Sequence, residues 1–242
     1  MEKNIEVKIT GSPKKVAKRA SKYILALLQN SGNQRFDIAL SGGSTPKLLF
    51  ERLTEKLVDK SDWKRIHLWW GDERCVPMDS SESNFRMTEE TLISKVPIPK
   101  GNIHRIRGEA NPEAEALRYG QEIRNNLNIL HNWPVFDLII LGLGEDGHTA
   151  SIFPDQMKLI NSNEICDVAV HPDTGQKRIT LTGNVINNAN EIFFLVTGKS
   201  KAQKVAEIMN NEPSAKKLPA YYIIPKHGKL TWFIDEDAAA NI

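Results

Sequence analysis

The chain has few of the features that mark secreted, membrane-spanning or metal-binding proteins. Its 242 residues include only two cysteines, Cys75 and Cys166, which is too few for a disulfide framework. No apolar stretch at the N-terminus resembles a signal peptide or a spanning helix. The six histidines show no H-x-x-x-H spacing and no histidine–cysteine cluster. We therefore expect a cytoplasmic protein with no bound metal and no other cofactor.

The chain also lacks an excess of charge of one sign. It has 32 basic and 30 acidic residues, a net charge of +2, and the basic residues are scattered along the sequence. This balance argues against nucleic acid or an anionic membrane as a partner. No biased segment suggests a linker, and the length suits one α/β domain spanning residues 1–242, with no obligate protein partner evident.

A buried strand followed by a glycine-rich loop dominates the middle of the sequence. Residues 136–142 are apolar except for Asp137 and have no helical period, which is typical of a strand buried on both faces of a parallel sheet. The loop that follows contains Asp146, Gly147 and His148. An imidazole delivered to the rim of a parallel sheet indicates an active site.

The same loop matches the dinucleotide fingerprint G-x-G-x-x-G through Gly142, Gly144 and Gly147. That fingerprint requires a helix that opens at the loop, but Pro154 would end such a helix after about one turn. Glu145 and the neighbouring aspartate would also face the phosphates. We interpret the match as coincidental.

A second glycine loop follows the predicted strand at 36–40. Gly42 and Gly43 precede Ser44 and Thr45 there, and the proline at 46 suits the first turn of a helix with Leu49, Leu53 and Leu57 on its buried face. Free amides, the helix dipole and two hydroxyl groups form a potential phosphate seat. An ordinary capped turn remains the alternative. The loop is not a Walker loop, because G-x-x-x-x-G-K-[ST] is absent.

A third strand, predicted at 66–70, ends at the polar group Asp72, Glu73 and Arg74. Carboxyl ends of neighbouring parallel strands face one crevice, so this group can meet the other two loops. A surface charge cluster is the alternative interpretation. The segment 75–84 is rich in serine, aspartate and proline and could form a flap.

Hydrophobic patterns predict the remaining elements. We expect a helix after Pro13, another near Ser83, a long helix from Asn111 to Leu130, and a helix at 200–209. The long helix should use Leu117, Ile123, Leu127 and Leu130 as apolar contacts. Further strands are expected at 5–9, 102–106, 165–170, 178–181, 192–196, 221–224 and 230–234.

Several of these motifs together resemble the glucosamine-6-phosphate isomerase/6-phosphogluconolactonase family. The matching stretches are ALSGGSTPK at 39–47, WWGDERCVP at 69–77, SNFRM at 83–87, LGLGEDGHTASIFP at 141–154, RITLT at 178–182 and TGKSKA at 197–202. The resemblance implies a three-layer α/β/α sandwich with a mainly parallel, Rossmann-like sheet. It also implies hydrolysis of 6-phosphoglucono-δ-lactone to 6-phosphogluconate in the oxidative branch of the pentose phosphate pathway.

Lactone hydrolysis needs an attacking water, a base and positive charge near the developing oxyanion. His148 is the candidate base, Arg74 the candidate for the oxyanion or the product carboxylate, and Asp72 a candidate to orient Arg74 or a sugar hydroxyl. The resemblance implies a phosphate seat made of Gly43, Ser44, Thr45, Arg178 and Lys201. Gly42, Asp146 and Gly147 would support these loops.

Two alternatives remain open. One is the sister activity, a sugar-phosphate isomerase or deaminase, and the other is a sugar-phosphate sensor without catalysis. By resemblance, the deaminase branch carries a glutamate just before the proline of the histidine loop, where this chain has Phe153. A phenyl ring can neither accept nor donate a proton, which favours the lactonase, although Asp72 could still serve as a base.

Overall fold

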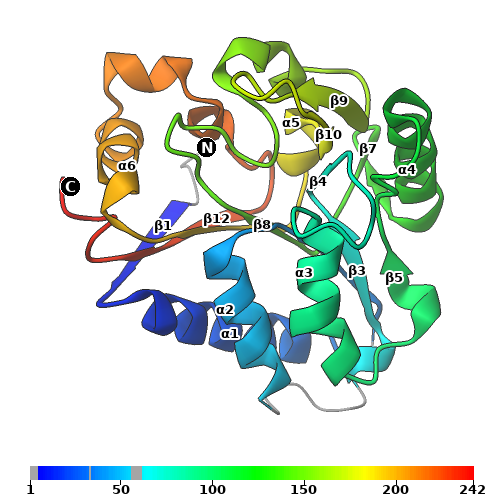
Figure 1. The fold of residues 1–242 in the computed structure, drawn as a ribbon. Helices are drawn as coiled ribbons and strands as arrows, with labels where there is room; N and C mark the ends of the chain where they lie inside the picture. The colour runs from blue at the N-terminus through cyan, green and yellow to red at the C-terminus, as the bar shows by residue number, and fades with distance from the viewer. Residues whose placement is uncertain (1–4, 33, 56–61) are drawn as a thin grey trace.

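The computed structural model describes residues 5–32, 34–55 and 62–242. Its centre is a seven-stranded sheet in the order β1-β12-β11-β8-β2-β3-β5, in which all neighbouring pairs are parallel (Figure 1). The strands are β1 (Ile5–Thr10), β2 (Phe36–Leu40), β3 (Ile66–Trp70), β5 (Ile103–His104), β8 (Leu138–Leu141), β11 (Glu191–Val196) and β12 (Lys229–Asp235). The predicted parallel sheet is confirmed.

Helices cover both faces of this sheet, which gives the expected three-layer α/β/α sandwich. Consecutive strand residues point to opposite faces. Trp70 packs on Phe85 of α3, whereas Trp69 packs on Tyr119 of α4, so these two helices lie on opposite faces. The helices are α1 (Pro13–Asn30), α2 (Ser44–Thr54), α3 (Asn84–Thr91), α4 (Pro112–Asn126), α5 (Gly183–Ile186) and α6 (Ala202–Met209).

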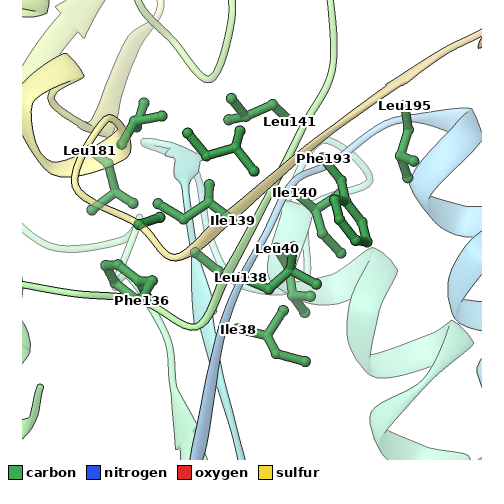
Figure 2. Close-up of a cluster of buried hydrophobic side chains, with 14 of the residues drawn as sticks. Ile38, Leu40, Phe136, Leu138, Ile139, Ile140, Leu141, Leu181, Phe193 and Leu195 are labelled. Carbon is green, nitrogen blue, oxygen red and sulfur yellow. The ribbon is translucent and has the colours of Figure 1, made fainter. Parts of the chain in front are cut away.

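The central strands are buried on both sides, and their sequences are apolar except for Asp37 in β2 and Glu191 at the start of β11. All four residues of β8 and all five of β2 are buried, and their side chains pack with those of β11 (Figure 2). Burial on both faces leaves the loops at the strand ends as the place where polar groups can gather. No helix of the described residues is long and apolar enough to cross a bilayer.

A smaller antiparallel sheet, β4-β10-β9, lies beside the large one. It joins β4 (Asp72–Arg74), β9 (Cys166–Val170) and β10 (Lys177–Leu181). The strands predicted at 165–170 and 178–181 are present within one residue, but the short strand at 72–74 was not predicted, because three polar residues carry no strand pattern. Pairing of β4 with β10 places Arg74 opposite Arg178 and Asp72 opposite Thr180. A two-stranded hairpin joins β6 (Ile129–Leu130) to β7 (Trp133–Pro134).

Three predictions about local structure are wrong. The strand expected at 221–224 is replaced by a 3₁₀ helix, Pro219–Tyr222, which has a proline in its first turn. The long helix ends at Asn126, and Leu117 and Leu130 are exposed at 70% and 40%. The buried face of α4 is formed by Ala116, Tyr119, Gly120 and Ile123.

Smaller differences concern helix boundaries. Lys201 does not lie inside α6 but at its N-cap, where it is the last residue of a 3₁₀ turn, Lys199–Lys201. The helix predicted near Ser83 ends at Thr91, and a 3₁₀ turn follows it. Leu57, expected on the buried face of α2, lies outside the described residues.

Candidate active site

A cleft of about 480 Å³ opens at the carboxyl ends of the central strands. Loops after β2 and β8 form its floor, and the small sheet with the β9–β10 turn forms a wall. The lining residues are Ser41, Gly42, Gly43, Asp72, Arg74, Asn84, Gly142, Leu143, Gly144, Glu145, Asp146, His148, Ala150, His171, Asp173, Arg178 and Lys201. Eight residues predicted from the sequence therefore meet here, while Ser44, Thr45 and Gly147 are not part of the lining.

His148 is held by Asp146 on the same loop. The Asp146 carboxylate lies 2.6 Å from Nδ1 of His148 and also accepts the backbone N–H of His148 at 3.0 Å. Burial raises the pKa of Asp146, but these hydrogen bonds outweigh it and leave that pKa below its usual value. An ionised carboxylate only accepts, so the proton belongs on Nδ1 and the lone pair on Nε2. Nε2 of His148 therefore carries a lone pair that can accept a hydrogen bond or a proton.

Gly144 leaves room for this pair. A Cβ at position 144 would lie 2.1 Å from Nδ1 of His148 and 2.5 Å from Oδ1 of Asp146. Both atoms would have to move if Gly144 carried any side chain. The glycine is needed here for close approach, not for an unusual backbone conformation.

Phe153 forms a platform beneath the cleft. Its side chain is fully buried, and its ring contacts the rings of His148 and His171 at centroid separations of 4.9 and 5.1 Å. The guanidinium carbon of Arg178 lies 5.5 Å from the centre of the same ring. One aromatic side chain therefore positions three polar groups.

Asp72 is buried and fixed by neutral donors. Ser151 Oγ donates to its carboxylate at 2.6 Å, and the side-chain amide of Asn84 donates to its backbone carbonyl at 2.9 Å. Arg74 makes neither an ion pair nor a hydrogen bond with Asp72 within the described part of the chain. The arrangement therefore gives no support to the hypothesis that Asp72 orients Arg74. Its carboxylate remains available to a sugar hydroxyl.

Arg74 and Arg178 bring two guanidinium groups to one wall of the cleft. They lie directly opposite each other on β4 and β10, and the Nε of each is buried without a hydrogen-bond partner. Arg74 donates to the carbonyl of Glu82. Burial and the positive charge of Arg74 lower the pKa of Arg178 from its usual value. Two cations this close, with no carboxylate paired to either in the described residues, favour an anionic ligand.

Glu73 proved to be a structural residue instead of a surface charge. Its side chain is 2% exposed, and it accepts hydrogen bonds from Ser83 Oγ and from the backbone of Asn84 and Phe85, at 2.8–3.0 Å. Burial raises the pKa of Glu73 in spite of these bonds. The contacts anchor the start of α3 to β4, and thereby fix Asn84 beside the cleft.

The entrance of α2 contributes backbone to the cleft. Gly43, at the N-cap, has a φ of +105°, a conformation that favours glycine. Ser44 begins the helix, and the Thr45 hydroxyl lies 2.7 Å from that of Thr197, which ties the loop after β2 to the loop after β11. Gly42 has no room for a Cβ, which would lie 1.9 Å from the Asn84 side chain. Gly147, behind the cleft, has a φ of +87°.

Lys201 faces the cleft from the start of α6. Its ammonium lies 3.7 Å from the exposed carboxylate of Glu145, a contact too long and too solvated to hold it firmly. The contact leaves the ammonium of Lys201 free to turn toward the cleft. In the described part of the chain, no three His, Cys, Asp or Glu side chains are grouped as metal ligands would be.

Nine of the lining residues were not predicted as site residues, and Ser41, His171 and Asp173 are three of them. Ser41 directly follows β2, and its buried Oγ has no hydrogen-bond partner. His171 and Asp173 lie in the turn between β9 and β10, where the His171 ring accepts the backbone N–H of Asp173 at 3.2 Å. The position of Ser41 at a strand end was a usable signal. His171 and Asp173 could not be predicted, because the sequence of the turn does not indicate the antiparallel pairing of β9 with β10 that brings it to the cleft.

Sequence and structure comparisons identify similar proteins of known family. The family model described as "Glucosamine-6-phosphate isomerases/6-phosphogluconolactonase" matches residues 11–232. A 6-phosphogluconolactonase of Treponema pallidum is 43% identical over 191 residues, 79% of each chain. The crystal structure of a devB protein superposes with a TM-score of 0.92 at 42% identity and covers 98% of this chain and 99% of its own. A 6-phosphogluconolactonase from Trypanosoma brucei gives 0.88 at 28% identity and 100% coverage of both chains.

An imidazole–carboxylate pair and unpaired cations at the strand ends of a parallel sheet define an α/β enzyme for a small anionic substrate. Within that class, the chain belongs to the glucosamine-6-phosphate isomerase/6-phosphogluconolactonase family, whose model spans it from residue 11 to residue 232.

Proposed function

We propose that this protein hydrolyses 6-phospho-D-glucono-1,5-lactone to 6-phospho-D-gluconate, as a cytoplasmic enzyme of the oxidative branch of the pentose phosphate pathway. Relatives that bear the name 6-phosphogluconolactonase support this reaction. The structural observation that carries the proposal is the His148–Asp146 pair, which shares one cleft with Arg74, Arg178 and Lys201.

His148 acts as the general base. Its Nε2 takes a proton from water while the water oxygen bonds to the lactone carbonyl carbon, and Asp146 stabilises the imidazolium that forms. The tetrahedral intermediate then collapses, the bond from that carbon to the ring oxygen breaks, and the imidazolium returns the proton to the departing oxygen. General-base assistance of this kind contributes roughly a hundred- to ten-thousand-fold to a rate.

The cations divide between the two charged parts of the substrate. The phosphate carries about −1.5 to −2 charges at neutral pH and is assigned to Arg178, Lys201 and the backbone at Gly43 to Thr45. Arg74 is assigned to the oxyanion or the product carboxylate. Because Arg74 and Arg178 are cross-strand neighbours, the substrate must lie along this wall with one charged part near each.

The phosphate assignment has its own test. Arg178→Ala or Lys201→Ala should raise KM roughly tenfold to a hundredfold, because a hydrogen bond to a charged group contributes about 1.5–3 kcal/mol. Both substitutions should also reduce the preference for phosphorylated over plain lactone. A preference that stays unchanged in both variants would place the phosphate elsewhere.

The catalytic assignment is tested by His148→Ala. We expect kcat to fall at least a hundredfold with a modest change in KM, because the change removes proton transfer and leaves the cations in place. Enzyme-dependent hydrolysis must be measured above the spontaneous background. A kcat within a few-fold of normal would remove His148 from the mechanism.

The sister activity has a separate test. Phe153 occupies the position of the deaminase glutamate, so we expect no ammonia release from glucosamine 6-phosphate. Ammonia release at a rate comparable to lactone hydrolysis would replace the lactonase assignment with a deaminase. Failure of the protein to accelerate either reaction would favour the sensor.

A further inference from the structure

Strand β1 leaves one edge of the seven-stranded sheet open. Among the strands of the described residues it pairs only with β12, whereas the opposite edge strand, β5, is only two residues long (Figure 1). Three alternate side chains of β1, Ile5, Val7 and Ile9, are exposed at 39%, 39% and 47%. An exposed apolar edge strand is a template for pairing with a further strand.

The same three residues present their backbone groups outward. The carbonyl of Thr10 accepts the N–H of Glu236 at 3.0 Å, so the peptide groups of Thr10 face β12. In a parallel pair the N–H and C=O of one residue share a side, and that side alternates along the strand. Ile5, Val7 and Ile9 therefore face away from β12. A hydrogen bond from Arg19 to the carbonyl of Ile9 at 3.4 Å agrees with this orientation, and Arg19 must release that carbonyl before Ile9 can pair with a second strand.

The sequence of β1 is complementary to itself when read in opposite directions. In an antiparallel pair with a two-fold axis through Val7, Ile5 lies opposite Ile9 of the second copy, and Glu6 opposite Lys8. The outward-facing residues then form the hydrogen-bonded pairs, and the charged residues form the closer pairs between them. Within each chain Glu6 already pairs with the buried Lys8 and with Lys229, so the two-fold pair would bring two such clusters together with opposite charges facing across the axis, which is stabilising.

Other registers are disfavoured by charge. Moving the axis by one residue keeps the hydrogen-bonding pattern but places Glu6 opposite Glu6, or Lys8 opposite Lys8, of the second copy. Parallel pairing of two identical edges would not close by a two-fold axis. Of these three registers, only the one with its axis at Val7 places opposite charges across the two strands.

We propose that the protein forms a two-fold homodimer in which two β1 strands pair antiparallel about Val7 and join the two seven-stranded sheets. The cleft lies at the ends of β2, β4, β8 and β10, and β11 and β12 separate β1 from β8. Dimerisation therefore leaves both clefts open, and lactone hydrolysis reports whether a variant is folded.

Charge substitutions at the axis test this pairing. Sedimentation velocity of the whole chain should show a concentration-dependent species of about twice 27.3 kDa. Val7→Lys and Val7→Glu should each raise the dimer dissociation constant at least tenfold, because each places like charges across the axis. An equimolar mixture of the two variants should restore the dimer. Ile129→Lys and Ile129→Glu are matched controls, since Ile129 is 45% exposed on another strand.

Introduced cysteines test the register directly. Opposite residues of a hydrogen-bonded pair have Cα atoms about 5.5 Å apart, within reach of a disulfide. Val7→Cys should therefore cross-link with itself on mild oxidation. Ile9→Cys should not, but should cross-link when mixed with Ile5→Cys.

Several outcomes would overturn the proposal. They are a chain that stays monomeric at the highest concentration measured, a dimer unaffected by Val7→Lys, and a mixture of the charge variants that does not associate. Cross-linking of Ile9→Cys with itself would overturn the register.

Discussion

Substituting alanine for Gly144 is the sharpest probe of the catalytic geometry. The new Cβ would lie 2.1 Å from Nδ1 of His148, whereas ordinary contact begins at 3.4 Å, so the imidazole must retreat by roughly 1.3 Å. A displacement near 1 Å can cost about a hundredfold in rate. We expect kcat for the lactone to fall roughly a hundredfold, with KM changed only a few-fold because the cations do not touch position 144.

The control for this variant is Gly101→Ala. Its Cβ would meet no atom within 4 Å, and Gly101 lies outside the cleft. Hydrolysis should be followed by acid release with the enzyme-free rate subtracted, and thermal melts should show that both variants are folded. If Gly144→Ala kept kcat within threefold of normal while its structure showed a displaced imidazole, catalysis would not depend on the observed His148–Asp146 geometry.

Three further predictions concern neighbouring groups. Asp146→Asn should lower kcat roughly tenfold or more, because the amide no longer stabilises the imidazolium. Steady-state kinetics measures this change, and an unchanged kcat would show that Asp146 does not stabilise the imidazolium. Phe153→Ala should reduce the free energy of unfolding by about 3–5 kcal/mol in urea titrations, because the ring is fully buried, and a loss below 1 kcal/mol would contradict the platform. Burial and the charge of Arg35 lower the pKa of His67 from 6.5 to about 4, against the opposing charge of Asp37 and with His104 adding to the shift. Neutral His67 therefore stabilises the fold above pH 6.5, and that contribution is lost as the pH falls toward 4. Because His67 is partly exposed, we expect the free energy of unfolding to fall by roughly 1 kcal/mol over this range. His67→Gln should flatten this pH dependence of stability.

The large sheet was predictable because its strands carry strong and simple signals. The segments 36–40, apolar except for Asp37, and 138–141, wholly apolar, lack a helical period, and glycines follow each strand. Parallel topology then places their loops on one edge, which is why Gly43, Asp72 and His148 could be brought together from residues far apart in the chain. The cleft confirms that convergence, while the roles of the residues stay predictions.

What escaped prediction depends on tertiary contacts. Glu73 has the composition of a surface residue, and only the fold shows that it caps the start of α3. The strand at 72–74 exists because β10 pairs with it, not because of its own propensity. Leu117 fits the pattern of an apolar helix face, but the packing of α4 against β9 and β10 leaves it exposed.

Position 153 shows how the fold separates the two chemistries of the family. A carboxylate there would replace a ring that is fully buried and lies 5.5 Å from the guanidinium carbon of Arg178. It would be desolvated unless it paired with Arg178, and such a pair would withdraw that cation from the substrate phosphate. It would also remove the surface on which His148 packs. Phe153 therefore does more than omit an acid–base group: it packs against both the Arg178 guanidinium and the His148 ring. Under the proposed assignment of Arg178 to the phosphate, a change to the sister chemistry would require rearrangement of that seat as well as a new carboxylate.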